Sequence, residues 1–451
     1  MLQIGYAARD FTPKRPAMIQ GQMHVRIGRE AKDPLTLTAL AIDGAESQAL
    51  LISCDLAMVS EELLARVRRQ LVKRLPAVPP NALIMTATHT HDSLVLEDGF
   101  YTHPGGDVMT AAECLERVAE RAAEAAVEAW QARTPRQLAR AFGQAVVGHS
   151  RRACYRDGSA LMYGSTNRPD FTWFEGYEDH SLDMLFVWEP DGRLAGVVLA
   201  IPCPSQVDEH LSVFSADFWH DIRLELRRRF GPELMVLGLC GAAGDQSPHF
   251  LLYGPQEEEM RQRRGLSERQ EIAVRVGDAV ARALACTTPA PGDAPLACVS
   301  RQVTLTAIRI TPEQRDWAAA EYQRCVKDGW DLTSWWPAQQ AKVVEAFDRN
   351  QPWPALPVEL HGLRIGELGM VTNPFELFLD YGLRIKARSP APQTMVVQLA
   401  AGRGMYLPTE RALRGGHYSA LPAVCQVGPE GGQELVEASL AMLGELFPAA
   451  K

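Results

Sequence analysis

The feature that most constrains this chain is the segment from Ala82 to His91, where an apolar run leads directly into two histidines, His89 and His91. The run follows Pro79-Pro80 and has the length of a buried strand, because such strands are short, apolar and bounded by turn residues. Open α/β sheets place their chemistry beyond the carboxyl ends of these strands. Since strand side chains alternate, both imidazoles could share a face and reach one metal ion or one substrate atom. The alternative is two unrelated histidines in a loop.

The flanking segments predict a β-α-β unit. Residues Ala49 to Cys54 form an apolar strand, and Ser60 caps a helix to about Leu75 with apolar residues at helical spacing. A loop over residues 92–107 leads to a helix rich in Ala and Glu, from 111 to about 132. Frequent Pro and Gly over the first forty residues predict loops there.

The remainder of the chain alternates predicted strands and helices. Strands are expected over 137–147, 183–201 with a break at Asp191-Gly192, 233–240, 299–310, 358–365, 367–372 and 395–399, and helices over 215–230, 267–286, 312–327, 338–349, 374–386 and from 433. Residues 150–180 and 402–418 fit neither pattern, and no internal repeat is evident. We therefore expect an α/β fold with mixed sheets and flanking helices, as a single catalytic unit over 1–451 with a subdomain boundary near 287–296.

The composition excludes several classes of protein. A formal net charge of -9 with scattered Lys and Arg gives no basic stripe for nucleic acid. Nine widely spaced cysteines without a CxxC pair favour reduced thiols. No secretion signal and no apolar stretch of membrane-spanning length are visible. We expect a cytoplasmic protein with a small-molecule partner and no transmembrane segment, and the oligomeric state, a homo-oligomer included, is left open.

Two further groups of polar side chains are ambiguous on the residues alone. Asp217 and His220 lie three residues apart at the start of a predicted helix, a spacing compatible with metal coordination. Alternatively, Asp217 only caps the helix and His220 packs beside Trp219. Glu376 falls in the first turn of another predicted helix, where the macrodipole stabilises a carboxylate without any further role.

Short motifs occur in a fixed order along nearly the whole chain. They are Asp10-Phe11-Thr12-Pro13, Thr88-His89-Thr90-His91, Gly244-Asp245-Gln246-Ser247-Pro248, Pro374-Phe375-Glu376 and Met405-Tyr406-Leu407-Pro408-Thr409, followed by Tyr418. This series resembles the neutral (non-lysosomal) ceramidase family, whose members are zinc amidases that cleave an N-acyl bond. The second and third motifs are fairly specific, and the others are weak singly.

The resemblance implies a zinc site with one ion per chain and assigns its ligands. His89 and Glu376 correspond to zinc ligands of the family, and Tyr406 corresponds to its unusual tyrosine ligand. The neutral ceramidase catalytic domain is accordingly the fold that the resemblance implies. We expect no counterpart of the immunoglobulin-like domain that follows it in that family.

The resemblance also implies groups that act on the substrate. His91 would hold the polarised carbonyl or the attacking water and assist proton movement toward the leaving amine. Tyr418 matches a tyrosine that contacts the scissile amide. Arg151 would stabilise the oxyanion, with Arg152 as the alternative in register.

The sequence departs from the family at the second zinc histidine. The matching position is Pro202, which cannot bind a metal ion. The candidate replacements are Cys203, His210 and His220. We favour His220, because Asp217 at the i, i+3 position could be a co-ligand or could orient the imidazole.

These assignments predict an amide hydrolase in which metal-activated water attacks the carbonyl. Asp245 and Ser247 are expected to brace the site as a supporting loop, since no base for a serine nucleophile is evident. The aromatic residues of the segment from Tyr163 to His180 are a candidate substrate wall, or else a buried cluster under a loop.

The substrate class is less certain than the chemistry, because function depends on the site and not on the fold. Ceramide is therefore not carried over, and the substrate is expected to be a small or lipid-like amide. Two alternatives are left open. One is a metal-dependent hydrolase of esters or N-acetyl sugars on the same scaffold, and the other is a non-catalytic binding protein with a degenerate metal site.

Overall fold

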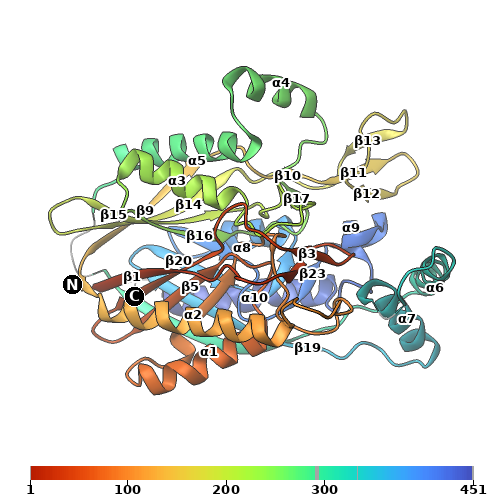
Figure 1. Cartoon of the computed structure of the whole chain (residues 1–451), viewed down its shortest axis with the longest axis horizontal. Helices are drawn as coiled ribbons and strands as arrows, with labels where there is room; N and C mark the ends of the chain where they lie inside the picture. Colours follow the sequence, from red (N-terminus) through yellow and green to blue (C-terminus); the bar gives the residue numbers. More distant parts are fainter. Residues whose placement is uncertain (1, 290–293, 333, 449–451) are drawn as a thin grey trace.

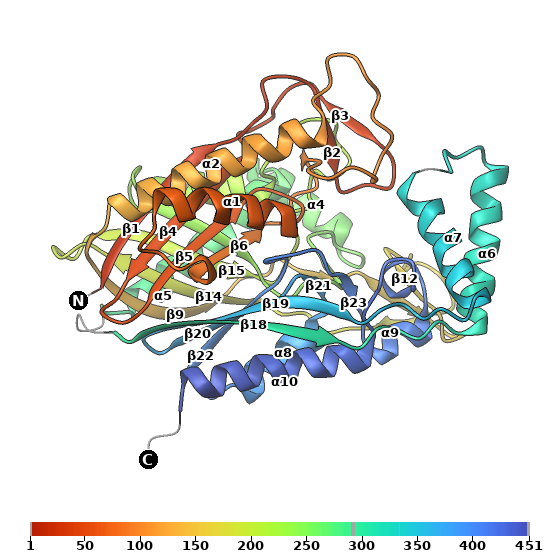
Figure 2. The same cartoon turned by 90° about the horizontal axis from the view of Figure 1, so that it is seen from below.

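The computed structural model describes residues 2–289, 294–332 and 334–448. Its centre consists of three sheets, and each sheet is built from the same succession of elements (Figures 1 and 2). Three antiparallel strands are followed by a helix, a fourth strand parallel to the third, and a second helix. The chain thus contains three units of one topology. The expectation of no internal repeat is wrong at this level, because many different apolar residues satisfy the pattern of a buried strand.

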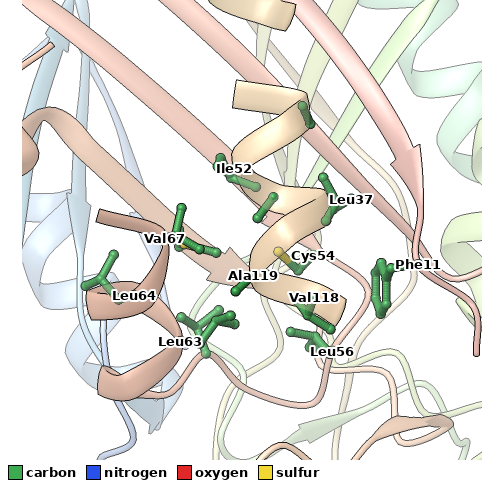
Figure 3. Packing of buried hydrophobic residues seen from close by; sticks show 14 of the residues in the cluster. Phe11, Leu37, Ile52, Cys54, Leu56, Leu63, Leu64, Val67, Val118 and Ala119 are labelled. Atoms are coloured by element: carbon green, nitrogen blue, oxygen red, sulfur yellow. The ribbon is translucent and has the colours of Figure 1, made fainter. Parts of the chain in front are cut away.

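The first unit forms the sheet with strand order β6-β5-β4-β1-β8. Its elements are β1 (Gln3–Asp10), β4 (Thr36–Asp43), β5 (Gln48–Cys54), α1 (Glu61–Arg74), β6 (Leu83–Ala87) and α2 (Ala111–Gln131), with the short β2 (Ala17–Gln20), β3 (Arg26–Gly28), η1 (Pro80–Ala82), β7 (Ser93–Leu94) and β8 (Thr134–Pro135). Ser60 caps α1 through its side chain, as expected. Both helices pack on the outer face of the sheet, where Ile52, Val67 and Ala119 meet in one cluster (Figure 3).

The second unit forms the sheet with strand order β16-β15-β14-β9. Its elements are β9 (Gln137–Gln144), β14 (Ser181–Trp188), β15 (Leu194–Ile201), α3 (Phe218–Phe230), β16 (Met235–Cys240) and α5 (Glu268–Ala285), with β10 (His149–Ser150), β11 (Arg152–Tyr155), β12 (Ala160–Met162), β13 (Phe171–Phe174), β17 (Gln246–Ser247) and α4 (Gly254–Arg264). Trp219 of α3 and Val276 of α5 are buried in one cluster with the outer face of this sheet.

The third unit forms the sheet with strand order β18-β19-β20-β22. Its elements are β18 (Leu296–Leu305), β19 (Leu356–Ile365), β20 (Leu368–Thr372), α8 (Leu379–Arg388), β22 (Gln393–Val397) and α10 (Pro429–Leu446), with α6 (Pro312–Lys327), α7 (Trp335–Asp348), β21 (Phe375–Leu377), β23 (Met405–Leu407), α9 (Glu410–Gly415) and η2 (Tyr418–Ala420). Helices α8 and α10 cover its outer face, on the opposite side of the molecule from α1 and α2 (Figure 2).

The inner faces of the three sheets meet in a common core. Ile42 of the first sheet, Val198 of the second and Met370 of the third belong to one buried cluster. Because both faces of each sheet are covered, the central strands read as continuous apolar runs and not as alternating ones. Burial of this kind contributes roughly 25 cal/mol per Å² of apolar surface removed from water.

Several predictions of secondary structure are confirmed and others are wrong. The helices at 60–75, 111–132, 215–230, 267–286 and 312–327 are present within a few residues. The first forty residues contain β1 to β4 and not only loops, and residues 150–180 contain β11 to β13. The expected helix over 374–386 begins only at Leu379, since Phe375–Leu377 is the strand β21. The predicted boundary near 287–296 falls between the second and third units, and residues 290–293 lie outside the described residues.

Candidate active site

The three sheets direct equivalent ends toward one region of the molecule. In each unit the third and fourth strands are parallel, so their carboxyl ends lie at the same edge, as in open α/β sheets that bind ligands there. The segments beyond these ends carry His89 in the first unit, Gln206 in the second and Glu376 in the third. His89 follows the fourth strand of its unit, whereas Gln206 and Glu376 follow the third strands of theirs, so connections at the same edge of each sheet supply the polar residues of one site.

The insertions between the first two strands of each unit converge on the same place. They carry Gln20 on β2, Arg151 next to β11 and Trp335 at the start of α7. Gln20 and Trp335 line one cavity with His89 and Glu376. The site is therefore surrounded by all three units.

His89 is held by contacts within its loop. Strand β6 ends at Ala87, and His89 has φ 64°, a left-handed conformation that a non-glycine residue keeps only when its surroundings fix it. Its backbone N–H donates to the Leu56 carbonyl (2.9 Å), and its Nδ1 lies 2.6 Å from the Ala57 carbonyl oxygen. Because a carbonyl only accepts, Nδ1 carries a proton and donates to Ala57. The expectation that His89 and His91 share a strand face is wrong, although the loop brings their ring centroids to 4.8 Å.

Glu376 and Tyr406 are paired by a short parallel ladder between β21 and β23. Their Cα atoms are partners in register, and both side chains are buried. Burial alone would raise the pKa of Glu376, but nearby His89 lowers it. Burial and the Glu376 carboxylate raise the pKa of Tyr406 well above its ordinary value. Because Glu376 lies on β21, it does not belong to the first turn of a helix.

The atoms of His89 and Glu376 that face each other lack a normal hydrogen bond. His89 Nε2 lies 3.3 Å from Glu376 Oε2, is buried and has no hydrogen-bond partner. Both atoms are out of contact with water, so each needs a partner. A second proton on the imidazole, or a cation bound between the two atoms, would supply it.

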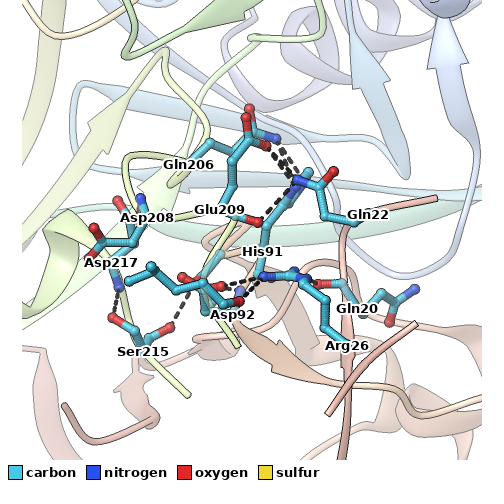
Figure 4. Close-up of polar contacts among 12 residues, drawn as sticks. Gln20, Gln22, Arg26, His91, Asp92, Gln206, Asp208, Glu209, Ser215 and Asp217 are labelled. Atoms are coloured by element: carbon cyan, nitrogen blue, oxygen red, sulfur yellow. Dashed lines mark hydrogen bonds and ion pairs between the residues drawn. The ribbon is translucent and has the colours of Figure 1, made fainter. Parts of the chain in front are cut away.

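His91 is held on both ring nitrogens (Figure 4). Nδ1 lies 3.2 Å from Glu209 Oε2, and Nε2 lies 2.7 Å from Gln206 Nε2. Because the carboxylate accepts, Nδ1 donates to Glu209 and the Gln206 amide donates to Nε2. Burial lowers the pKa of His91 in spite of the Glu209 carboxylate. Gly21 is required beside the ring, since a Cβ there would lie 2.4 Å from His91 Cγ.

A buried arginine supports the backbone of this loop. Arg26 of β3 forms an ion pair with Asp92 (2.8 Å between Nη1 and Oδ1) and donates to the carbonyl oxygens of His91 and Leu211 (Figure 4). Both charged side chains are almost fully buried. Arg26 thus ties the loop after β6 to the segment after β15.

Arg151 links the second and third units at the site. Its Nη1 donates to Tyr163 Oη (3.1 Å) and Gln206 Oε1 (3.3 Å). Its Nη2 donates to the Gly244 carbonyl (2.9 Å) and Tyr406 Oη (3.4 Å). Burial alone would lower the pKa of Arg151, but nearby Tyr163, Tyr406 and Glu376 raise it, so the guanidinium remains charged.

The neighbouring Arg152 has a different environment. It is fully buried, forms a two-bond ion pair with Glu175 (2.8 and 3.0 Å) and donates to Ser419 Oγ (3.0 Å). These contacts tie β11 to the segment that carries Tyr418. Of the two alternatives in register, Arg151 is the one next to Tyr406.

The cavity is narrow and largely aromatic on one side. His89, His91, Glu376, Tyr406 and Tyr418 all line it. The ring centroids of the two tyrosines are 5.4 Å apart. The remaining wall consists of Gln20, Gly21, Gln22, Met23, Ala57, Met58, Phe100, Tyr101, Trp335 and Met405, and the cavity volume is about 60 Å³.

Asp245 lies behind the cavity wall. Its Oδ1 accepts from the Leu379 backbone N–H (2.9 Å), and its carbonyl oxygen accepts from the Arg151 backbone N–H (3.1 Å). Burial raises its pKa to about 6. The Ser247 hydroxyl accepts from the His249 backbone N–H (3.2 Å). These contacts connect the loop after β16 to both Arg151 and α8.

The structure does not bring His220 into this group. Asp217 caps α3 and accepts from the backbone N–H groups of Phe218 and Asp208 (2.7 Å each), so its carboxylate is occupied. His220 lies in the first turn of that helix, and its side chain is half-buried. Cys203 is buried against backbone carbonyls, and His210 is exposed.

The expected aromatic substrate wall is not part of this cavity. Trp173 and Tyr177 are exposed, and Phe171 packs edge-on against Phe174 (5.5 Å between ring centroids). Besides Tyr406 and Tyr418, the aromatic residues that line the cavity are Phe100, Tyr101 and Trp335. Together with Gln206 and Glu209 they were missed in the sequence, because only the chain's path through three units brings them to the histidines.

Two structural features are absent from the part of the chain that the structure describes. Within residues 2–289, 294–332 and 334–448, no group of three or more His, Cys, Asp or Glu side chains is arranged to hold a metal ion. In the same part of the chain, no helix combines the length and the apolar character that crossing a bilayer requires.

The fold and the cavity define a three-unit α/β protein with a buried polar site at the carboxyl ends of its parallel strands. Solved structures share this fold. Neutral ceramidase from Pseudomonas aeruginosa matches with a TM-score of 0.70 and 16% identity, covering 99% of this chain and 74% of that one. A ceramidase complexed with C2 matches with a TM-score of 0.69 and 16% identity, covering 100% of this chain and 76% of that one. The resemblance recognised in the sequence is thereby confirmed for the fold.

Sequence comparisons are less informative at this distance. No protein-family model matches the chain, and no curated protein matches it. The assignment of chemistry must therefore come from the site.

Proposed function

We propose that this protein is a zinc-dependent hydrolase that cleaves an amide (N-acyl) bond, with one zinc ion per chain held by His89, Glu376 and Tyr406. The main support is the buried His89 Nε2, which lies 3.3 Å from Glu376 Oε2 and has no hydrogen-bond partner. A bound cation would give both of these atoms a partner.

The donor set suits a catalytic zinc site. Such sites use three protein ligands drawn mainly from imidazole and carboxylate groups and keep one position open. Bound zinc would supply a Lewis acid and would lower the pKa of a water molecule toward neutrality. A cation beside Tyr406 would also oppose the present raising of its pKa by Glu376, which would make the phenol a better ligand. The predicted ligand His220 is not included, because it does not line the cavity.

Two polar groups are candidates for stabilising an oxyanion. Tyr418 lines the cavity, whereas Arg151 is charged and buried outside its lining and donates to the hydroxyl of Tyr406, which lines it (3.4 Å). Donors held in place before the reaction stabilise an oxyanion most effectively. We assign both residues to the oxyanion.

His91 is the group that moves a proton. Glu209 holds its Nδ1 proton, so Nε2 carries the lone pair that takes a proton from water and returns it to the leaving amine. Gln206 now donates to that nitrogen and would be displaced by water or substrate. Asp245 and Ser247 serve as the supporting loop.

The fold shared with a neutral ceramidase supports an amide as the bond cleaved and a small or lipid-like amide as the substrate. We also propose that the protein acts in the cytoplasm, which its free cysteines support.

The test is hydrolysis of N-acyl amides by the purified protein. We expect a zinc chelator to abolish amine release and added zinc to restore it. Tyr406→Phe should lower kcat/KM by at least about a hundredfold, because it removes a ligand oxygen. Tyr177→Phe is the matched control, since Tyr177 is exposed outside the cavity. Hydrolysis that is insensitive to both chelation and Tyr406→Phe would overturn the proposal, as would zinc-loaded protein that cleaves no amide.

A further inference from the structure

The volume of the cavity restricts what can bind beside His89 and Glu376. It is about 60 Å³, whereas pockets for drug-sized ligands hold about 300–1,000 Å³. An engineered apolar cavity of about 150 Å³ accommodates benzene. The present cavity is less than half that size, so it admits a group of only a few non-hydrogen atoms.

The wall that limits this volume is built from two segments that contact each other. One is the start of α7, and the other is the segment between β7 and α2. Trp335 stacks on Phe100 with ring centroids 6.4 Å apart and planes 26° apart, and its backbone N–H donates to the Phe100 carbonyl (3.3 Å). Trp336, the next residue of α7, packs against Tyr418 at 6.0 Å. Helices α6 and α7 lie side by side at the right of Figure 2, and α7 begins with Trp335.

Other contacts also fix the side chains of this wall. The Tyr101 hydroxyl donates to the Gln22 carbonyl, and the Gln22 side chain donates to the Glu209 carbonyl (3.0 Å). The guanidinium of Arg403 lies 4.8 Å from the centroid of the Phe100 ring, a cation–π contact. Each of these side chains is held by a partner on another element, so the narrow shape is a property of the packed structure.

We infer that the substrate carries a short acyl group of about two to four carbon atoms. This inference rests on the proposed amide hydrolysis. The acyl group occupies the space bounded by Met58, Phe100 and Trp335, next to the carbonyl that His89 and Glu376 address. The amine part of the substrate lies toward the mouth of the cavity. A long fatty acyl chain has no room unless Trp335 moves.

The experiment measures kcat/KM for amides of a single amine, 7-amino-4-methylcoumarin. Its acyl groups contain roughly 2, 4, 8 or 16 carbon atoms, so that the series runs from groups that fit the cavity to groups that exceed it. We expect a fall of at least about tenfold between four and eight carbons, because overfilling a packed cavity is strongly unfavourable. Trp335→Ala should raise kcat/KM for the eight-carbon amide relative to the two-carbon amide by about tenfold. Trp173→Ala is the matched control, since Trp173 is exposed on β13 and should leave this ratio unchanged.

A second variant and a binding measurement keep the result interpretable. Met58→Ala enlarges the cavity from another element and serves if Trp335→Ala does not fold. Saturation-transfer NMR with acetate, butyrate and octanoate tests the acyl site without catalysis. If no amide is cleaved but the two short carboxylates bind and octanoate does not, the hydrolase proposal fails and the short-acyl inference stands. If the 8- or 16-carbon amide is the best substrate, or octanoate binds best, the inference is overturned. It is also overturned if no amide is cleaved and no carboxylate binds.

Discussion

Glu209 is the residue whose replacement best separates the proposed chemistry from simple stability. Its carboxylate lies between two histidines, 3.2 Å from His91 Nδ1 and 3.7 Å from His249 Nε2. Burial alone would raise the pKa of Glu209, but these histidines lower it. Glu209→Gln removes the charge and leaves an amide that can donate as well as accept, so the Nδ1 proton of His91 is no longer specified.

The magnitude follows from the hydrogen bond that is lost. A bond to a charged group contributes about 1.5–3 kcal/mol. Since about 1.4 kcal/mol corresponds to a tenfold change in rate, kcat should fall by about tenfold to a hundredfold. Because Glu209 acts through His91 and does not hold the substrate, KM should change by less than about threefold.

The chain offers a matched control for this substitution. Glu178 also bridges two histidines, with Oε2 3.5 Å from His149 Nδ1 and 3.3 Å from His180 Nε2, but it does not line the cavity. Glu178→Gln should leave kcat within about twofold of wild type. Urea unfolding of both variants shows how much stability each loses. The reasoning is refuted if Glu209→Gln retains full kcat, or if Glu178→Gln lowers kcat as much.

Two further predictions concern stability. Arg223 holds the buried carboxylate of Asp55 through two bonds (2.7 and 2.9 Å), so Arg223→Met should cost about 3–5 kcal/mol in urea unfolding, and a cost below about 1 kcal/mol would contradict this. Burial alone would lower the pKa of His249, but Glu209 and Glu268 raise it to about 10. This stabilisation is therefore complete below about pH 6.5 and disappears as the pH rises to about 10. Urea unfolding at pH 6, 8 and 10 should show a steeper fall for wild type than for His249→Gln, and equal slopes would refute the assignment.

The parts of the fold that were predicted from sequence are those with local signals. The strand before Asp55, the helix capped by Ser60 and the helix after Thr110 have clear caps and apolar periodicity. Strand β1 was missed because its pairing with β4 is not encoded locally, and Pro13 and Pro16 lie in the connection between strands and not within one. The threefold repeat of topology was missed for the same reason, since strand order depends on contacts between distant residues.

The site divides in the same way. His89, Glu376, Tyr406 and Tyr418 were named by resemblance, and the structure brings them to one cavity. Gln206 was missed because nothing in the sequence around it indicates contact with His91 and Arg151, which lie on other connections. The aromatic segment named as a candidate substrate wall does not line this cavity, because local composition does not tell which segment lies next to His89 and Glu376.

His89 lines the cavity, but the geometry that places it there differs from the geometry that the sequence predicted. An alternating strand would present both histidines on one face, but the strand ends at Ala87. The left-handed backbone of His89 and the Ala57 carbonyl instead turn Nε2 toward Glu376. Loop geometry of this kind is set by the surrounding units, so the sequence alone could not provide it.

The most direct test of the account is the metal content of the purified, untagged protein, measured by elemental mass spectrometry. We expect about one zinc per chain in wild type. His89→Ala and Glu376→Ala should each release it, while His220→Ala, a histidine outside the cavity, should retain it. Zinc that is retained by the first two variants, or wild-type protein that takes up no zinc after reconstitution, would contradict the proposed metal site.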